Sequence, residues 1–316
     1  MANKKISAKS INLSRIKEFS FAKFKKLKIV NIIAKIAIYF ILICIGYVFL
    51  KPIFEMISKS IMTTADLIDP TITWIAKHPT GENFVNAISQ LDIPASLIGS
   101  IFFSTLLALA QTAVSATTGF ALSRYTFKGR NIWYIMLILA FILPIPLLTV
   151  PRMMIFDQLF AMTGIKLIGT IWPQFLMALL GQGAYSTMLI LIFYNFFNMI
   201  PKTLDEAAMI DGAGSLKVFY HVAVRLSLST ILVVFLFSFV FNWNETYTTN
   251  TMLRDALTLL PVKLATFDNG SGAETAINEA QRMAATLVSI APLLILYAVV
   301  QKQFIQGIEN TGITGE

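Results

Sequence analysis

The sequence predicts an all-α membrane protein with six transmembrane helices. Its composition is 56% hydrophobic and only 13% charged, whereas soluble domains are about 25% charged. The mean hydropathy is +0.71, and the apolar residues gather in six long segments. The positive charge is instead concentrated at the N-terminus and in short connections between those segments. A soluble domain this apolar would have too little polar surface to remain in solution, so the bilayer is the expected solvent.

The N-terminal segment, residues 1–31, is strongly basic. Nine lysines and arginines lie within the first 28 residues and are opposed only by Glu18. A basic block ahead of an apolar segment is typical of a cytoplasmic flank that is attracted to anionic lipid. This clustering argues against a nucleic-acid partner as the reason for the net charge of +8. A secretory signal peptide is excluded because Lys51 and Pro52 follow the first apolar run without a small-residue cleavage pattern.

Six segments are long and apolar enough to cross a bilayer, which takes about 20 residues. They are residues 32–57, 95–122, 131–151, 171–197, 222–243 and 284–304. The third segment contains Pro144, Pro146 and Pro151. Because proline removes a backbone donor and clashes with the preceding turn, we expect the third span to kink or to end early.

The charges of the connecting loops predict how the spans are oriented. The loop between the second and third spans carries Arg124, Lys128 and Arg130 without any acidic residue, which marks it as cytoplasmic. The segment 58–94 has four acidic residues against two lysines and is predicted to be external. Both termini are then cytoplasmic, in a multi-pass membrane protein. The other predicted regions are a five-helix core at 95–304, a cytoplasmic loop at 198–221, an external segment at 244–283 and a cytoplasmic tail at 305–316.

The most informative motif lies in the predicted cytoplasmic loop and reads PKTLDEAAMIDGAG, residues 201–214. Thr203 can cap a short helix, and two acidic residues follow in the first turn, where negative charge suits the helix dipole. Two alanines then favour the helix and add little bulk, and an Asp-Gly pair allows a sharp turn. A second, amphipathic run follows over residues 216–224. The pattern predicts a short helix that projects below the membrane and can enter a groove on a partner.

This loop resembles the EAA loop of ABC importer permeases, in which EAA is followed by three residues and a glycine. Three further stretches resemble the same family in the expected order, so that the resemblance covers most of residues 55–316. They are WIAKHPTGENF at 74–84, NWNE at 242–245 and QKQFIQG at 301–307. Within that family, the maltose-type carbohydrate permeases are the most similar group. The resemblance implies a type I importer permease architecture, in which the loop forms the coupling helix that seats in a cleft of the ATPase. The matching residues are Glu206, Ala207, Ala208, Asp211, Gly212 and Ala213.

The resemblance also implies the partners. They would be a second, homologous permease subunit, two cytoplasmic ABC ATPases, an external solute-binding protein, membrane lipid and a carbohydrate substrate. The sequence has no GxxxxGK[ST] motif, so we expect ATP and Mg²⁺ to be bound by the partner ATPases. We therefore expect no cofactor in this chain and no enzymatic activity of its own.

The chain departs from that family in two places. Relatives usually carry a Leu-Pro pair where this chain has Val224 and Arg225, and their tails usually end in small residues with Lys-Gly, where this chain has residues 313–316. Without the proline, we expect one helix to run continuously from the loop into the fifth span. Arg225 is expected to pair with Asp205, with Asp211 or with an acidic group of the ATPase. Contact with lipid phosphate alone is an equally open alternative.

Polar side chains within the apolar segments are candidates for the substrate path, because a polar group inside a membrane is costly and needs a reason. Amide and carboxylate groups suit the hydroxyl groups of a sugar, although each could instead bond a neighbouring helix. The candidates are Gln111, Gln174, Asn195, Asn242, Asn244 and Glu245. The single cysteine, Cys44, and the two isolated histidines have no metal-ligand spacing, so no metal site is predicted.

Three alternative functions differ from a sugar importer. The first is an ABC importer permease for a non-sugar solute. The second is an ion-coupled secondary carrier, which would need paired intramembrane carboxylates or an inverted repeat, and the sequence shows neither. The third is a membrane-embedded enzyme, which would need converging His, Asp or Glu residues within the spans, and Glu245, a strong acid near the edge of the fifth span, is not accompanied by such residues.

Overall fold

The computed structural model describes residues 13–267 and 273–312, and every element assigned within these ranges is helical. The chain divides into two units, Met1–Ser58 and Lys59–Glu316. Within the described residues, four helices are long and apolar enough to cross a membrane, or six if each of two sharply bent helix pairs counts as one span.

The described residues of the first unit all belong to the helix α1, Leu13–Ser60, whose last two residues fall in the second unit. The part from Asn31 to Ser60 has the length and composition of a membrane span and extends beyond the predicted 32–57. Apolar side chains such as Ile36, Phe40 and Ile43 are exposed around it. A helix that is apolar on all sides is suited to lipid.

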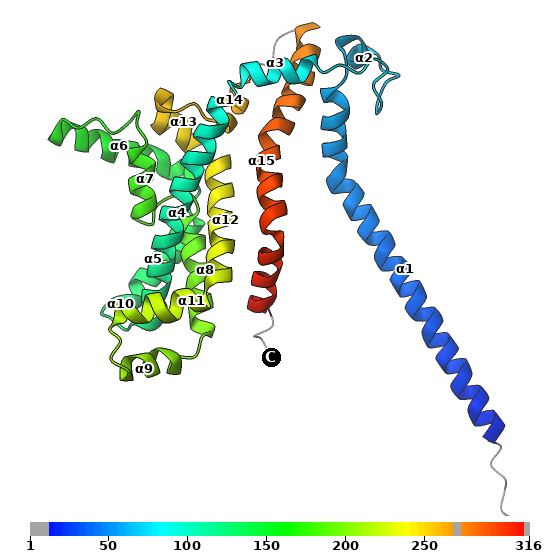
Figure 1. Ribbon diagram of the computed structural model, residues 1–316, viewed down its shortest axis with the longest axis horizontal. Helices are drawn as coiled ribbons and strands as arrows, with labels where there is room; N and C mark the ends of the chain where they lie inside the picture. The colour runs from blue at the N-terminus through cyan, green and yellow to red at the C-terminus, as the bar shows by residue number, and fades with distance from the viewer. Residues whose placement is uncertain (1–12, 268–272, 313–316) are drawn as a thin grey trace, which may run out of the picture. The chain divides into compact units, whose positions relative to one another are not determined.

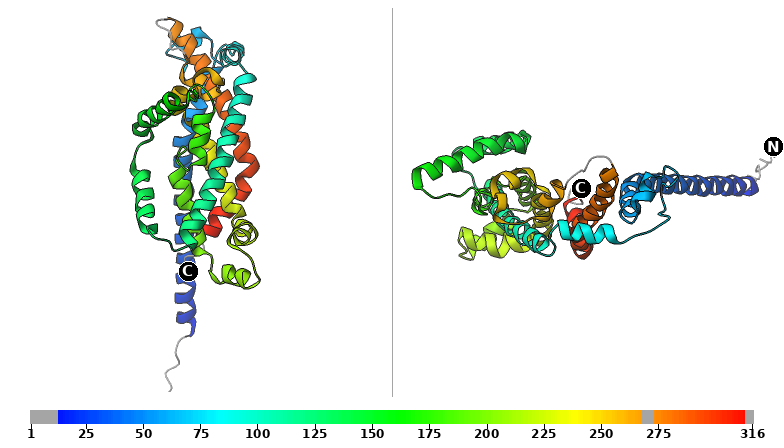
Figure 2. Two further views of the ribbon diagram at one scale, coloured as in Figure 1. Left: turned by 90° about the vertical axis from the view of Figure 1, so that its left-hand side faces the viewer. Right: turned by 90° about the horizontal axis from the view of Figure 1, so that it is seen from above.

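The second unit is a helical bundle built around α4, Ala95–Arg124. This helix packs against α7 (Trp172–Leu179), α8 (Ser186–Met199) and α12 (Leu228–Asn244), and α12 in turn packs against α15 (Ala273–Gly312). Figures 1 and 2 show these helices running roughly side by side. The remaining longer elements are α2 (Thr64–Ile68), α3 (Glu82–Gln90), α5 (Arg130–Ile142), α6 (Ile145–Thr163), α9 (Thr203–Ile210), α13 (Tyr247–Leu253) and α14 (Leu260–Ala265).

The two ends of this bundle differ, and each has its own apolar core. Helices α9 and α10 (Ser215–Val218) lie at one end, and α3, α13 and α14 lie at the other (Figure 1). The core near α9 joins residues of α4, α8 and α12 to Val218 and Phe219. The core at the other end joins α3, α4, α12, α14 and α15, with Trp243 and Leu260 fully buried. The bundle therefore holds the motif loop at one end and the segments predicted to be external at the other.

The tightest helix contact in the bundle is between α4 and α8. A Cβ atom built on Gly119 of α4 would lie 2.6 Å from the Cβ of Phe193 and 2.9 Å from the backbone nitrogen of Tyr194. Such distances are below van der Waals contact, so only glycine lets the two helices approach this closely. Small residues at helix interfaces are the usual route to close packing in membranes.

The third predicted span, 131–151, ends early, as the prolines indicated. Helix α5 stops at Ile142, because a residue before proline is disfavoured in the helical region and Pro144 itself is extended. The 13 residues of α5 would rise about 20 Å at 1.5 Å per residue, which is less than a hydrocarbon core of about 30 Å. Helix α6 then follows, lying crosswise to α4 at the α13 end (Figures 1 and 2).

The fourth predicted span, 171–197, is also interrupted. Helix α7 ends at Leu179, and α8 begins only at Ser186. Between them the backbone enters the left-handed region at Gly181 and at Tyr185, where φ is 71° and 54°. This break, residues 180–185, is positioned by a polar network described below.

The prediction of a continuous helix through Arg225 into the fifth span is wrong. The helical stretch Ser215–Leu226 and α12 meet at an angle of 81°, so the span begins at Leu228 rather than at 222. A π-helical turn, Phe219–Ala223, precedes the bend. At the corner, the backbone N–H of Ser227 donates to the carbonyl oxygens of both Ala223 and Val224 at 3.0 and 3.2 Å. The chain therefore turns here without a proline.

The last span is part of the long helix α15, in which Asn278–Lys302 has the composition of a membrane span. This is slightly earlier than the predicted 284–304. The turn predicted at 268–272 lies outside the described residues, as do residues 313–316 of the predicted tail and residues 1–12 of the basic N-terminal segment.

Candidate functional site

The motif loop folds as the short helix α9, which leaves α8 at an angle of 76°. The predicted cap at Thr203 is wrong, because Thr203 is the first helical residue and Lys202 takes the capping position without a side-chain bond. Backbone turns begin the helix instead, as the N–H groups of Leu204 and Asp205 donate to the carbonyl oxygens of Pro201 and Lys202 at 3.3 and 3.0 Å.

A buried ion pair fastens α9 to the bundle. Nε of Arg124, the last residue of α4, lies 2.8 Å from Oδ2 of Asp205, and the two side chains are only 6% and 10% exposed. Nε makes no hydrogen bond among the described residues, so charge rather than an aligned N–H contact holds the pair. The expected pairing of Asp205 with Arg225 is therefore wrong: Arg225 is exposed, and its helix turns away at the bend.

The six residues predicted to couple to an ATPase divide between two faces of α9 and its turn. Glu206, Ala207 and Asp211 are exposed, whereas Ala208 and Ala213 pack against the apolar core near α9. The remaining residue, Gly212, has φ of 84° and allows the turn after the helix, which is closed by the N–H of Ala213 donating to the carbonyl of Ala208 at 2.9 Å.

An apolar surface surrounds this helix. Ile210 is 86% exposed and Leu216 is 75% exposed, and Leu204, Met209 and Tyr220 are also exposed. Large apolar side chains gathered on a protruding element are typical of a protein interface. The geometry of α9 therefore fits a docking helix: one side is bound to α4, and the other presents Ala207 and large apolar groups.

A second cluster lies inside the bundle, around Gln111 of α4, which is fully buried. Its Nε2 donates to the carbonyl of Ala184 and to Oγ of Ser186, both at 3.1 Å. Its Oε1 accepts from Nδ2 of Asn242 at 2.7 Å and from the hydroxyl of Ser238. The side chain thus joins three elements: α4, the 180–185 break with the start of α8, and α12.

The break approaches Gln111 so closely that only glycine fits at position 183. A Cβ on Gly183 would lie 1.9 Å from Nε2 of Gln111 and 2.8 Å from its Cδ. Two of the predicted substrate-path residues, Gln111 and Asn242, therefore bond to each other between helices. The sequence left open whether each polar residue contacts substrate or bonds a neighbouring helix. For Gln111 and Asn242, the contacts are bonds between helices.

Three of the predicted polar residues line one cleft, at the α13 end of the bundle. They are Gln174, Asn242 and Glu245, and Arg152 and Gln182 line it with them. Nε2 of Gln174 donates to Oγ1 of Thr249 at 2.9 Å. Oε1 of Glu245 accepts from the backbone N–H of Thr248 at 2.9 Å, which holds the carboxylate at the start of α13.

Arg152 was not among the predicted site residues, although a basic residue directly after an apolar segment and beside Pro151 was a signal for it. It lies on α6, and its Nη2 donates to Oε1 of Gln182 at 3.3 Å. The other two predicted residues do not join the cleft. Asn195 is exposed on α8, and Asn244 is exposed and donates to the carbonyl of Val240 at 2.9 Å on its own helix.

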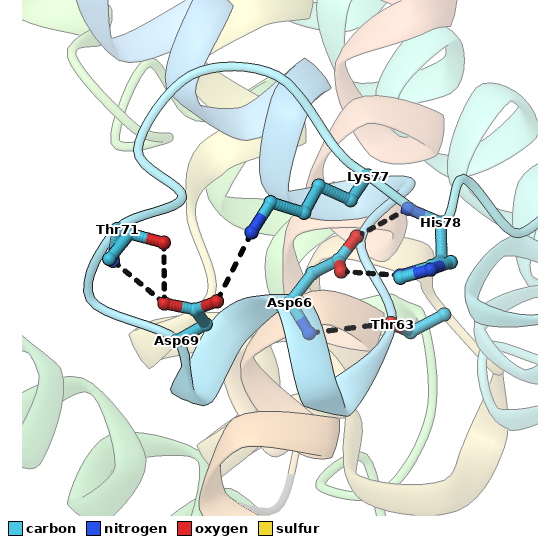
Figure 3. A network of polar contacts seen from close by, with 6 residues as sticks. All are labelled: Thr63, Asp66, Asp69, Thr71, Lys77 and His78. Carbon is cyan, nitrogen blue, oxygen red and sulfur yellow. Dashed lines mark hydrogen bonds and ion pairs between the residues drawn. The ribbon is translucent and has the colours of Figure 1, made fainter.

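A polar network orders the segment between α2 and α3 (Figure 3). The buried carboxylate of Asp66 accepts from the backbone N–H of His78 at 2.8 Å and contacts Nδ1 of its ring at 3.0 Å. The carboxylate of Asp69 accepts from the N–H and hydroxyl of Thr71 at 2.9 and 2.7 Å, and Nζ of Lys77 lies 3.4 Å away. The His78 backbone bond lowers the pKa of Asp66, and the Thr71 bonds lower the pKa of Asp69.

The same segment is fastened to the rest of the second unit by uncharged and charged contacts. Nδ2 of Asn83 donates to the carbonyl oxygens of Ser60 and Met62 at 3.0 and 2.9 Å, and Nζ of Lys59 lies 2.6 Å from Oε1 of Glu279 on α15. No group of three or more potential metal ligands occurs in the described part of the chain.

Comparison with known proteins connects these features to a family. Residues 111–310 match the family described as "Binding-protein-dependent transport system inner membrane component". This stretch includes Gln111, the cleft, the motif loop and α12, but not α1 or the Asp66 network.

Curated relatives cover nearly the whole chain. The trehalose/maltose transport system permease protein MalG of Thermococcus litoralis is 32% identical over 290 residues, covering 87% of this chain and 97% of that protein. The arabinooligosaccharides transport system permease protein AraQ of Halalkalibacterium halodurans is 24% identical over 87% of this chain and 96% of its own length. The diacetylchitobiose uptake system permease protein DasC of Streptomyces coelicolor is 26% identical over 87% of this chain and 95% of its own length.

A solved structure has the same fold. It is the crystal structure of a bacterial ABC transporter involved in the import of the acidic polysaccharide alginate, and one of its chains superposes with a TM-score of 0.67. The superposition covers 94% of this chain and all of that chain, at 19% sequence identity.

Proposed function

The chain belongs to the family of inner-membrane components of binding-protein-dependent transport systems, and from this premise we propose that it conducts a carbohydrate across the bacterial cell membrane. It is a multi-pass translocation subunit with the type I ABC importer permease fold. Three relatives that cover 87% of this chain are permeases named for trehalose and maltose, arabinooligosaccharides and diacetylchitobiose. A non-sugar solute is not favoured by these names.

The single observation that carries the proposal is the geometry of α9. Its exposed side presents Glu206 and Ala207 within an apolar surface, and its buried side is held to α4 by the Arg124–Asp205 pair. A helix of this kind can seat in a groove of an ATPase and pass the movement of that ATPase to the bundle. The six motif residues Glu206, Ala207, Ala208, Asp211, Gly212 and Ala213 would then form or position the coupling surface.

The transport cycle needs partners that bring the chemistry this chain lacks. Two cytoplasmic ATPases would bind ATP and Mg²⁺, a second homologous permease would complete the path, and an external binding protein would deliver the sugar. ATP-driven closure of the ATPases would pull α9 and switch the bundle between an outward-facing and an inward-facing state. The permease itself would form no covalent bond with the substrate.

The proposed orientation places both termini and α9 in the cytoplasm, with residues 58–94 and 244–283 outside. Single cysteines at Gly81 and Lys202, in a Cys44→Ser background, test it. We expect an impermeant thiol reagent to label position 81 but not position 202 in intact cells, and to label both after lysis. Labelling of position 202 in intact cells would reverse the orientation.

The proposed function is tested by uptake of radiolabelled maltose, trehalose and chitobiose into cells that express the whole transporter. We expect uptake of at least one sugar to be lost when this chain is deleted and restored when it is supplied again. We also expect uptake to stop when the partner ATPase is inactivated, and to persist when a protonophore collapses ion gradients. Uptake that persists without the active ATPase but stops when the protonophore is added would indicate an ion-coupled carrier. If deletion of this chain changes the uptake of no sugar, the proposal is contradicted.

A further inference from the structure

The cleft at the α13 end contains a buried amide that lacks half of its hydrogen bonds. Gln174 is only 7% exposed and lines the cleft. Its Nε2 bonds Thr249, but its Oε1 has no partner among the described residues. If the amide were turned over, Nε2 would be unpartnered instead, so one polar atom remains in either orientation. A buried polar group without a partner is costly, and a ligand with hydroxyl groups would supply either the donor or the acceptor.

Two opposite charges face the same cleft without a direct ion pair between them. Arg152 and Glu245 both line it, yet they form no salt bridge in the described part of the chain. The guanidinium of Arg152 donates one N–H to Oε1 of Gln182 at a long 3.3 Å. The carboxylate of Glu245 accepts one backbone N–H through Oε1. The remaining N–H groups and Oε2 can therefore bond a ligand.

Together these groups are matched to a neutral polyol. A hydroxyl group both donates and accepts, so neighbouring hydroxyls can bind the arginine, the carboxylate and the amide in turn. The charges of Arg152 and Glu245 cancel, which gives no net preference for an anion or a cation. A ligand carboxylate would be attracted by Arg152 and repelled by Glu245 and could not donate to Glu245, whereas a hydroxyl group can bond either side chain.

An adjoining cavity of about 500 Å³ shares Arg152, Gln182 and Glu245 with the cleft. Tyr185 and Tyr247 line this adjoining cavity, and the two tyrosines are 47% and 52% exposed. An exposed tyrosine offers an apolar ring face and a polar hydroxyl at once, which suits the apolar face and hydroxyl edge of a sugar ring. Few polar groups set among apolar and aromatic side chains are the usual composition of a small-molecule site.

We propose that this subunit itself binds a neutral saccharide, through Arg152, Gln174 and Glu245 with Tyr185 and Tyr247 in the adjoining cavity. The proposal rests on the proposed function and extends it to the substrate class and to a site within this chain. The cleft is lined by residues from the start of α6, the 180–185 break, the end of α12 and the start of α13. Helix α13 lies at the end of the bundle opposite α9 (Figure 1). In the proposed orientation this is the external end, where sugar would arrive from the binding protein.

The test uses the complete transporter reconstituted in proteoliposomes, with saturating binding protein and the radiolabelled sugar whose uptake depends on this chain. The variants are Gln174→Leu, Arg152→Gln and Glu245→Gln, and the matched control is Asn244→Ala, which changes an exposed amide next to the cleft. We expect each cleft variant to raise KM for transport or lower kcat/KM by about tenfold, the equivalent of one lost hydrogen bond to a charged or buried group. The control should stay within about twofold of wild type.

Protection from labelling tests binding without depending on transport rates. A cysteine at Gln182, inside the cleft, is compared with one at Asn244, in a transporter whose other cysteines have been replaced. We expect the transported neutral sugar to slow thiol labelling at position 182 at least about fivefold and to leave position 244 unchanged, while its uronic acid analogue protects neither position.

The outcomes separate this site from the proposed function. If no panel sugar is taken up in a chain-dependent way, the proposed function fails. If a sugar is taken up, but the three cleft variants keep wild-type kcat/KM and position 182 is not protected, the site is overturned and the transport function stands. Protection by the uronic acid analogue in place of the neutral sugar would overturn the assignment of the substrate class.

Discussion

The buried pair between Arg124 and Asp205 offers the most direct test of how α9 is attached to the bundle. Both side chains are at least nine-tenths buried, and the charged atoms are 2.8 Å apart. Removing one partner of a buried ion pair leaves the other charge uncompensated, which costs about 3–5 kcal/mol. Replacing both by uncharged groups of similar volume is often close to neutral. We therefore expect Asp205→Asn and Arg124→Met each to be strongly destabilising, and the double variant to recover most of the loss.

The assay is a double-mutant cycle on the assembled transporter, read by the thermal unfolding midpoint and by ATPase co-purification. The matched control is Lys77→Gln, which breaks the exposed pair between Lys77 and Asp69 outside the candidate spans, with side chains 58% and 37% exposed. A solvent-exposed ion pair is worth only about 0.2–1 kcal/mol. If Asp205→Asn shifts unfolding and ATPase retention no more than the control does, the pair does not hold α9 in place and the reasoning is refuted.

Three further predictions concern backbone freedom, packing and pH. Gly212→Val should cost about 1–2 kcal/mol locally through backbone strain at φ of 84°, since nothing lies within 4 Å to cause a steric clash. In the assembled transporter, transport and substrate-stimulated ATP hydrolysis should fall together, whereas the control Gly214→Val, at φ of −71°, should leave both rates unchanged. Equal rates for the two variants would contradict the coupling role. Gly183→Ala should displace Gln111 and lower the stability of the bundle in thermal unfolding by about 1–3 kcal/mol. The control Gly214→Ala, which has open space around it, should not change the stability. A well-folded Gly183→Ala variant with an unchanged unfolding midpoint would show that the hydrogen bonds of Gln111 do not stabilise the bundle. The lowered pKa of Asp66 means that its stabilisation of the segment between α2 and α3 is fully present above the unfolded value of about 3.9 and is lost as pH falls through the lower folded value. Proteolysis of that segment should rise only in this acidic range. Asp66→Asn should reduce the pH dependence to the part that Asp69 contributes, since the pKa of Asp69 is also lowered.

The helical segments and the motif loop could be predicted from the sequence because both depend on local pattern. Length and hydropathy identify α1, α4 and α15 without reference to any other part of the chain. The prolines after Ile142 likewise act on their own neighbours, so the early end of the third span followed from them. The short helix after Pro201 was predictable for the same reason, since alanines, acids and an Asp-Gly turn all favour it within a few residues.

The errors arose where distant residues decide the outcome. The residues near Ser227 do not predict the 81° bend. The π-helical turn before the bend depends on the packing of Phe219 and Ala223 in the core near α9. The partner of Asp205 proved to be Arg124, 81 positions earlier by residue number, rather than the nearer Arg225. Arg152 was overlooked because only the fold brings it to Glu245 and Gln174.

The single helix α4 connects α9, the proposed coupling helix, to the proposed sugar site. Its last residue, Arg124, holds α9, and Gln111 on the same helix holds the 180–185 break and α12. Thirteen residues separate these two positions by number, about 20 Å along a helix that rises 1.5 Å per residue. Because an α-helix is stiff over that length, a shift of α9 that moves Arg124 also moves Gln111. Asn242 contacts Gln111 on one side and lines the cleft on the other, so we infer that ATPase closure reaches the sugar site through this helix and this amide pair.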